Sequence, residues 1–286
     1  MCAKSVFRKV INYEEARDLL EQMQKSKGRL LTGFRDLDAL TGGLINGGLT
    51  VIGSRPGMGR SSLALSIANR LATQMQGTIA IFSPQMRDTE IAARLLQAGL
   101  SLEAYRLFDG SVNGMEATEA FRKLMEARRA KIQIIRSTSP SLEEIAWHCQ
   151  GIPDLRLVIV DNIAYISNVP CIPDDGKAYP PERVPTEQVI NALKQLAMNE
   201  GIPVICTTYL HRRLERRKNK RPRLSDLKWI SLPEESADQI VFLYRDHYYN
   251  YESDDIAECI VAKNSHGNTG TAFLWWISET GAFADL

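Results

Sequence analysis

The feature that most constrains this chain is the regular alternation of short β-branched runs with helical stretches. Five apolar runs follow one another from residue 49 onward, at 49–54, 78–83, 131–137, 155–161 and 202–208. Helical spacing of apolar residues lies between them, over 60–75, 87–98, 114–130, 141–150 and 184–200. Continuous apolar strands separated by helices are typical of a parallel sheet covered on both faces. The sequence therefore predicts an α/β fold with a mainly parallel sheet.

The C-terminal stretch departs from this alternation. Its β runs at 238–245, 257–264 and 271–278 are joined by short turns, so we expect an antiparallel β-rich extension. Residues 170–185 hold five of the twelve prolines and are expected to form a long mobile loop.

The N-terminal stretch also differs. Residues 13–27 have the spacing of an amphipathic helix that ends at Gly28, and 32–48 are expected to form a glycine-rich loop region. We therefore expect two parts, an N-terminal helix within 1–28 and one α/β domain over 29–286.

Composition excludes several classes of protein. With 35 basic and 34 acidic residues the formal charge is +1, which excludes a uniformly basic nucleic-acid coat. The sequence holds no apolar run of the length that crosses a membrane and no apolar core of a secretory signal, so we expect a cytoplasmic protein without membrane contact. The dispersed cysteines form no CxxC pair, which argues against a disulfide framework and a structural zinc site. They are Cys2, Cys149, Cys171, Cys206 and Cys259.

A glycine-rich segment, GSRPGMGRSS at 53–62, joins the first strand to the first helix of the alternation. Gly53, Gly59 and Ser61 have the spacing of the phosphate loop G-x-x-x-x-G-K-[ST], in which backbone N–H groups and a helix N-terminus surround phosphates. Arg60 occupies the usual lysine position, so the strict pattern fails. The alternative is a strand-to-helix turn that binds nothing. The predicted nucleotide-binding residues are Ser54, Arg55, Pro56, Gly57, Met58, Gly59, Arg60, Ser61 and Ser62.

An acidic residue supports the nucleotide interpretation. Asp161 follows the buried run LRLVIV, where a metal-ordering carboxylate of a phosphate-loop NTPase belongs, although a turn or cap residue is the alternative. The hydroxyl of Ser61 is the second candidate ligand of Mg²⁺. The order of strands and helices and the two candidate ligands together indicate descent from a nucleotide-binding fold.

A basic run, HRRLERRKNKRPR at 211–223, follows the fifth strand of the alternation and carries a local charge of +7. Such a cluster binds phosphates through counterion release without reading the base sequence. The alternative is a solvated loop. The predicted DNA-binding residues are Arg212, Arg213, Arg216, Arg217, Lys218, Lys220, Arg221 and Arg223.

Six segments in this order resemble the C-terminal RecA-like motor domain of DnaB-type replicative helicases. They are TGFRDLDALTGGL (32–44), GSRPGMGRSSLALSIA (53–68), VIVDN (158–162), KRPRLSDL (220–227), ADQIVFLYRDHYY (237–249) and AKNSHGNTG (262–270). The resemblance extends from about residue 12 to the C-terminus. It implies a RecA-like P-loop ATPase with ATP and Mg²⁺ as cofactors, a role in DNA replication, single-stranded DNA as partner, and a homo-hexamer or co-assembly with a replicative helicase. The helix within 1–28 resembles the linker helix of the family, and we expect no counterpart of the family's collar domain.

The chain departs from the pattern of the family at four positions. The glutamate that polarises the attacking water falls on Gln85, which cannot accept its proton. The sensor glutamine falls on Tyr209, and the arginine finger supplied across the subunit interface falls on Ser265. Arg60 is the fourth position, whereas Lys263, the companion cation supplied in trans, persists.

Three functions follow from the resemblance and its departures. The one we favour is a DnaB-like protein that binds Mg·ATP and single-stranded DNA and hydrolyses ATP poorly. The alternatives are an active helicase, with Arg212 or Arg213 compensating in the site, and a non-catalytic structural partner of a replicative helicase.

Overall fold

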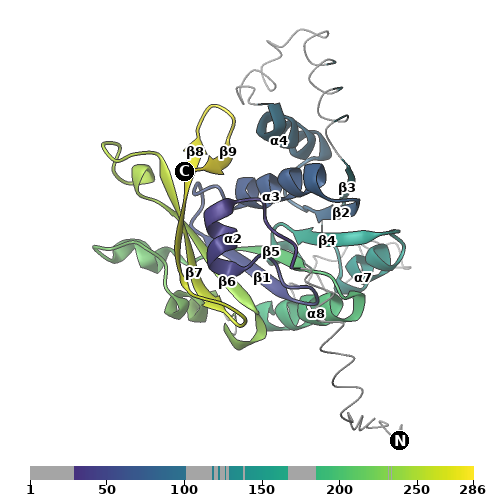
Figure 1. Cartoon of the computed structure of the whole chain (residues 1–286). Coiled ribbons are helices and arrows are strands. Elements are labelled where there is room, and N and C mark those ends of the chain that lie inside the picture. Colours follow the sequence, from purple (N-terminus) through teal and green to yellow (C-terminus); the bar gives the residue numbers. More distant parts are fainter. Residues whose placement is uncertain are drawn as a thin grey trace, which may run out of the picture.

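The computed structural model describes residues 29–100, 129–137, 139–166, 185–230 and 234–286, together with positions 118, 122, 126 and 232. The predicted N-terminal helix at 13–27 lies outside the described residues, as do the proline-rich loop at 170–185 except for Pro185 and most of the predicted helix at 114–130. Within the described part, strands form one nine-stranded sheet in the order β3-β2-β4-β5-β1-β6-β7-β8-β9 (Figure 1). Among the described helices, none combines the length and apolar character that crossing a bilayer demands.

The predicted parallel sheet is confirmed. Its strands are β1 (Leu49–Ser54), β2 (Gly77–Phe82), β3 (Ala130–Ile135), β4 (Leu155–Val160) and β5 (Val204–Tyr209). Parallel pairing runs through β3-β2-β4-β5-β1, with Gly53 beside Thr208 and Phe82 beside Val160. All five strands therefore end at the same edge of the sheet.

The C-terminal extension is antiparallel from β7 onward. It comprises β6 (Gln239–Arg245), β7 (Ile256–Asn264), β8 (Gly270–Ile277) and β9 (Ala282–Asp285). β6 joins the two halves because it runs parallel to β1 and antiparallel to β7. The expectation that 238–245 is antiparallel therefore holds only on its β7 side, and β9 was not predicted.

Helices cover both faces of the sheet, as predicted. α3 (Arg60–Gln74) and α4 (Asp88–Leu100) lie on one face, and α7 (Leu142–Gln150) and α8 (Thr186–Glu200) lie on the other (Figure 1). Successive residues of a strand point to opposite faces, so Ile81 joins the core under α3 whereas Phe82 joins the core under α7 and α8. The two buried faces explain why the strands read as uninterrupted apolar runs.

The interpretation of 32–48 as loop was wrong in part, because α2 (Arg35–Thr41) forms there. The Asp38 carboxylate folds back and accepts hydrogen bonds from the backbone N–H groups of Thr32 and Gly33 at 2.7 and 2.9 Å. Burial raises the pKa of Asp38 despite these hydrogen bonds. A helix of seven residues is too short to show a clear apolar period, so the surrounding glycines dominated the sequence signal.

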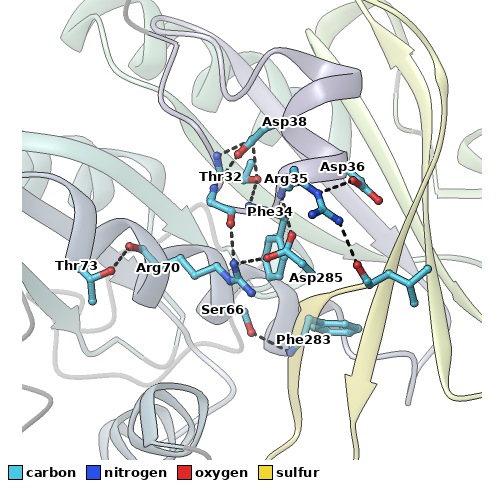
Figure 2. A network of polar contacts seen from close by, with 12 residues as sticks. Thr32, Phe34, Arg35, Asp36, Asp38, Ser66, Arg70, Thr73, Phe283 and Asp285 are labelled. Carbon is cyan, nitrogen blue, oxygen red and sulfur yellow. Dashed lines mark hydrogen bonds and ion pairs between the residues drawn. The ribbon is translucent and has the colours of Figure 1, made fainter.

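Polar contacts fasten the C-terminal strand β9 to α3 (Figure 2). The Arg70 guanidinium on α3 donates to the Asp285 carboxylate at 2.8 Å and to the Gly33 carbonyl at 2.6 Å. The backbone N–H of Phe283 donates to the Ser66 hydroxyl at 3.4 Å. Because α3 begins directly after the phosphate loop, these contacts fix the last strand of the sheet beside that loop.

Candidate nucleotide and nucleic-acid site

The predicted site residues gather at the edge where the parallel strands end. The phosphate loop follows β1, Gln85 lies just beyond β2, Asp161 follows β4, and Tyr209 ends β5. Ligands of open α/β sheets bind outside the carboxyl ends of the strands. The topology therefore brings together groups that are far apart in the sequence, such as Arg60 and Tyr209.

The phosphate loop needs glycine at two positions. Gly57 and Gly59 have φ angles of 81° and 94°, in the left-handed region that side chains rarely adopt. A Cβ atom on Gly57 would lie 2.7 Å from the ring of Tyr248, and one on Gly59 would lie 2.9 Å from the ring of Phe283. The loop thus combines a tight turn with close aromatic packing from the C-terminal extension.

A cavity of about 270 Å³ lies at this loop. Eight of the nine predicted nucleotide-binding residues line it, and the exception is Met58. The Met58 side chain is instead buried in the core, where its sulfur accepts a hydrogen bond from the backbone N–H of Arg245. Two lining residues that sequence analysis missed are Arg94 on α4 and Trp276 on β8, because no local motif marks them.

Arg60 adopts a conformation that the phosphate-loop pattern does not describe. Its guanidinium carbon lies 3.4 Å from the centroid of the Tyr209 ring, and its Nε donates to the Thr207 hydroxyl at 3.4 Å. The side chain is buried, with 6% of its surface exposed. The cation thus lies between the loop and the end of β5, and Arg55 and Arg94 are further cations that line the same cavity.

The oxygen donors beside the loop suit Mg²⁺. The Ser61 hydroxyl donates to the Asp161 carboxylate at 3.0 Å, and the Thr207 hydroxyl donates to the same carboxylate oxygen at 2.5 Å. Mg²⁺ bound with nucleotide phosphates takes one or two carboxylate oxygens and a hydroxyl from the protein. Ser61 and Asp161 would hold such an ion, which would neutralise phosphate charge when bound.

Gln85 is held between two phenols. The Tyr209 hydroxyl donates to Gln85 Oε1 at 3.1 Å, and Gln85 Nε2 donates to the Tyr165 hydroxyl at 2.6 Å. Tyr165 ends the short 3₁₀ helix η1 (Ile163–Tyr165) that follows Asp161. Tyr209 thus connects Gln85 to Arg60, because its hydroxyl binds the amide and its ring contacts the guanidinium.

Lys263, the predicted trans cation, binds carbonyls of its own chain. Its ammonium donates to the carbonyls of Glu234, Glu235 and Ala237 at 2.7, 3.2 and 2.6 Å. Three acceptors match the three N–H donors of an ammonium group. The neighbouring Ser265 is exposed, and its backbone N–H donates to the Asp238 carbonyl. A role of Lys263 across a subunit interface stays a prediction.

The structure divides the basic run of 211–223 into two sets. Arg217 forms a bidentate ion pair with the buried carboxylate of Asp226 at 2.9 and 3.2 Å, and Arg221 pairs with Glu258. Lys220 is half-buried, 4.9 Å from the centroid of the Tyr249 ring. The other five side chains are exposed to solvent, and they are Arg212, Arg213, Arg216, Lys218 and Arg223.

An ion pair links the phosphate loop to the start of the basic run. Arg55 donates through Nε to the Glu215 carboxylate at 2.9 Å and through a terminal nitrogen to the Leu210 carbonyl at 2.8 Å. Glu215 belongs to the 3₁₀ helix η2 (Arg212–Arg216), which carries three of the exposed basic residues. Neither Arg212 nor Arg213 lines the cavity. A compensating role for either arginine stays a prediction.

Comparison with known families decides the classification. The model of the "DnaB-like helicase C terminal domain" matches residues 29–285, almost all of the domain described above. The chain belongs to the DnaB-like helicase family. It carries the RecA-like ATPase domain that the sequence motifs suggested.

Individual DnaB-like relatives agree with this placement. The chain is 30% identical over 277 residues to the replicative DNA helicase DnaB of Geobacillus stearothermophilus and 29% identical to DnaC, the replicative DNA helicase of Bacillus subtilis. Each match covers 94% of this chain and 60% of the relative, so the chain spans less than two thirds of either.

Solved structures give the same result. One solved ATPase domain superposes with a TM-score of 0.80 at 29% identity, covering 97% of this chain and all of that domain. A DnaB-like replicative helicase, solved in a study of its interactions with primase, gives 0.79 at 26% identity over 98% of this chain and 68% of its own. The fold of the described domain is therefore that of a DnaB-like ATPase domain.

Proposed function

We propose that this DnaB-like chain binds Mg·ATP in the phosphate-loop cavity and single-stranded DNA at the exposed basic residues, and that it hydrolyses ATP slowly. It would act in DNA replication in the cytoplasm, as a homo-hexamer or in co-assembly with a replicative helicase. The proposal of slow hydrolysis rests mainly on the position of Gln85. Its amide is engaged on both sides by the phenols of Tyr165 and Tyr209.

The expected deficit has two sources. An amide cannot accept the proton of an attacking water, and general-base assistance is worth about 10²–10⁴ in rate. Ser265 at the position of the arginine finger removes a contribution of about 10³–10⁵. The cavity, its glycines and the Ser61–Asp161 pair support retained binding. Together they favour a nucleotide-binding subunit over a partner that has lost the nucleotide.

The test measures ATP hydrolysis with and without single-stranded DNA, beside direct binding of Mg·ATP. We expect binding, and turnover well below about 1 s⁻¹. Gln85→Glu, alone and with Arg60→Lys, is expected to raise turnover at saturating ATP at least tenfold, because a carboxylate can accept the proton of the attacking water. The two phenols that hold Gln85 can also hold the introduced carboxylate in place. Gln85→Asn is the matched control, which keeps an amide and should gain nothing.

Three results would contradict the proposal in different ways. DNA-stimulated turnover at or above about 1 s⁻¹ would establish the active helicase instead. Absence of Mg·ATP binding would leave a structural partner. Sedimentation as a monomer at every nucleotide and DNA concentration, and in a mixture with a replicative helicase, would exclude assembly into a ring.

A further inference from the structure

Three of the four residues that depart from the family pattern are linked by contacts beside the cavity. Tyr209 contacts Arg60 through its ring and Gln85 through its hydroxyl. We propose that Tyr209 is a positioning residue whose ring holds the Arg60 guanidinium with its terminal N–H groups toward the polyphosphate of a bound nucleotide. This inference rests on the proposed nucleotide binding and adds to it how an arginine replaces the phosphate-loop lysine. The pair would act as one unit, with Gln85 fixing the ring.

The distance between Arg60 and Tyr209 defines the orientation of the guanidinium. Its carbon lies 3.4 Å from the ring centroid, which is a contact distance between stacked planes. An N–H group pointing at the ring would place a nitrogen between the two and push the carbon farther away by about a bond length. The guanidinium therefore lies flat on the ring, and its N–H groups point sideways in its own plane.

The remaining contacts of Arg60 leave one side of the guanidinium for a ligand. Nε donates to the Thr207 hydroxyl, whose own hydrogen goes to Asp161. Among the described residues, the hydrogen bond of Nε to Thr207 is the one that the Arg60 side chain donates, and the residue lines the cavity together with Gly57 and Gly59. A buried cation needs a partner, and a phosphate chain in this cavity would supply one in the bidentate geometry that arginine favours.

The Tyr209 ring is itself held in place. Its hydroxyl donates to Gln85, which donates in turn to Tyr165 at the end of η1. A lysine has a compact ammonium that needs no such support, whereas the longer and planar arginine must be oriented before it can bind two phosphate oxygens. The tyrosine at the end of β5 therefore complements the arginine in the loop.

The test compares variants by calorimetric binding of ADP with Mg²⁺, which avoids turnover, and of inorganic tripolyphosphate. Tyr209→Leu removes the ring, so Arg60 must be ordered on binding, and we expect about threefold to tenfold weaker binding of both ligands. Tyr209→Phe keeps the ring but removes its hydrogen bond to Gln85, so its loss of binding should be smaller than that of Tyr209→Leu. In an Arg60→Met background, Tyr209→Leu should have no further effect. Without ligand, the losses in melting temperature of Tyr209→Leu and Arg60→Met should be less than additive.

The outcomes separate this inference from the proposed function. Equal binding by Tyr209→Leu, or equal effects of that change with and without Arg60, would overturn it while nucleotide binding stands. Tighter binding by Tyr209→Leu would mean that the ring draws Arg60 away from the phosphates, which also overturns it. Fast hydrolysis by the unmodified chain would refute only the slow turnover. If the unmodified chain binds neither ligand, both proposals fail, and if Tyr209→Leu does not fold, Tyr209→Gln is measured in its place.

Discussion

Replacing Arg212 and Arg216 by alanine is expected to reduce the salt dependence of single-stranded DNA binding by about two-fifths. Five basic side chains of the run are exposed, whereas Arg217 and Arg221 are held in ion pairs. Each phosphate neutralised on a single strand contributes about 0.7 to the slope of log K against log salt concentration. If each of the five exposed residues neutralises one phosphate, removing two of them lowers the slope by two-fifths. This fraction does not depend on how many protein chains bind the strand.

The assay is fluorescence anisotropy of a labelled oligonucleotide of mixed sequence, titrated at a series of salt concentrations. Arg221→Ala is the matched control, because it removes the same charge from a side chain committed to Glu258. It should leave the slope unchanged and lower the stability of the fold. An unchanged slope in the double variant, or an equal fall in the control, would refute the division of the basic run. An unchanged slope in the double variant would also favour the alternative that the basic run is a solvated loop that does not bind DNA.

Two further outcomes depend on buried groups. Asp226→Asn should lower the free energy of unfolding in urea by about 1.5–3 kcal/mol, since it weakens charge-assisted hydrogen bonds to the half-buried Arg217. The control is Asp36→Asn, at the exposed pair with Arg35, which should lower it by less than about 0.5 kcal/mol. Burial raises the pKa of the Cys149 and Cys259 thiols to about 12 and also raises that of Cys206. With the two other cysteines changed to serine, Ellman's reagent at pH 8 should label these three thiols only after unfolding.

The central strands could be predicted because both of their faces are buried. The two cores alternate along every central strand, so Ile79 and Ala80 are both apolar and the run reads without interruption. The same reasoning fails for β9, which has four residues and is held by pairing with β8 and by the Arg70–Asp285 contact. Short elements that depend on distant contacts leave little local pattern.

The candidate site could be predicted only where a motif is continuous. The phosphate loop and Asp161 are each marked by a strand and its exit, and the structure brings them within hydrogen-bonding distance through Ser61. Arg94 and Trp276 enter the cavity from α4 and β8, and only the tertiary fold reveals them. In the basic run, the sequence could not distinguish the exposed residues from Arg217 and Arg221, which form ion pairs with carboxylates, because all of them carry the same charge.

The contacts among Arg60, Tyr209 and Gln85 change how the departures from the family pattern are to be interpreted. In the sequence they are separate losses, and each could be reversed by itself. In the structure the Tyr209 ring contacts the Arg60 guanidinium and its hydroxyl binds Gln85. Residues in one network are not additive, so a single reversal such as Arg60→Lys would leave a ring shaped for a different cation. The reversal Arg60→Lys has therefore to be measured together with Gln85→Glu and with a change at Tyr209, as well as by itself.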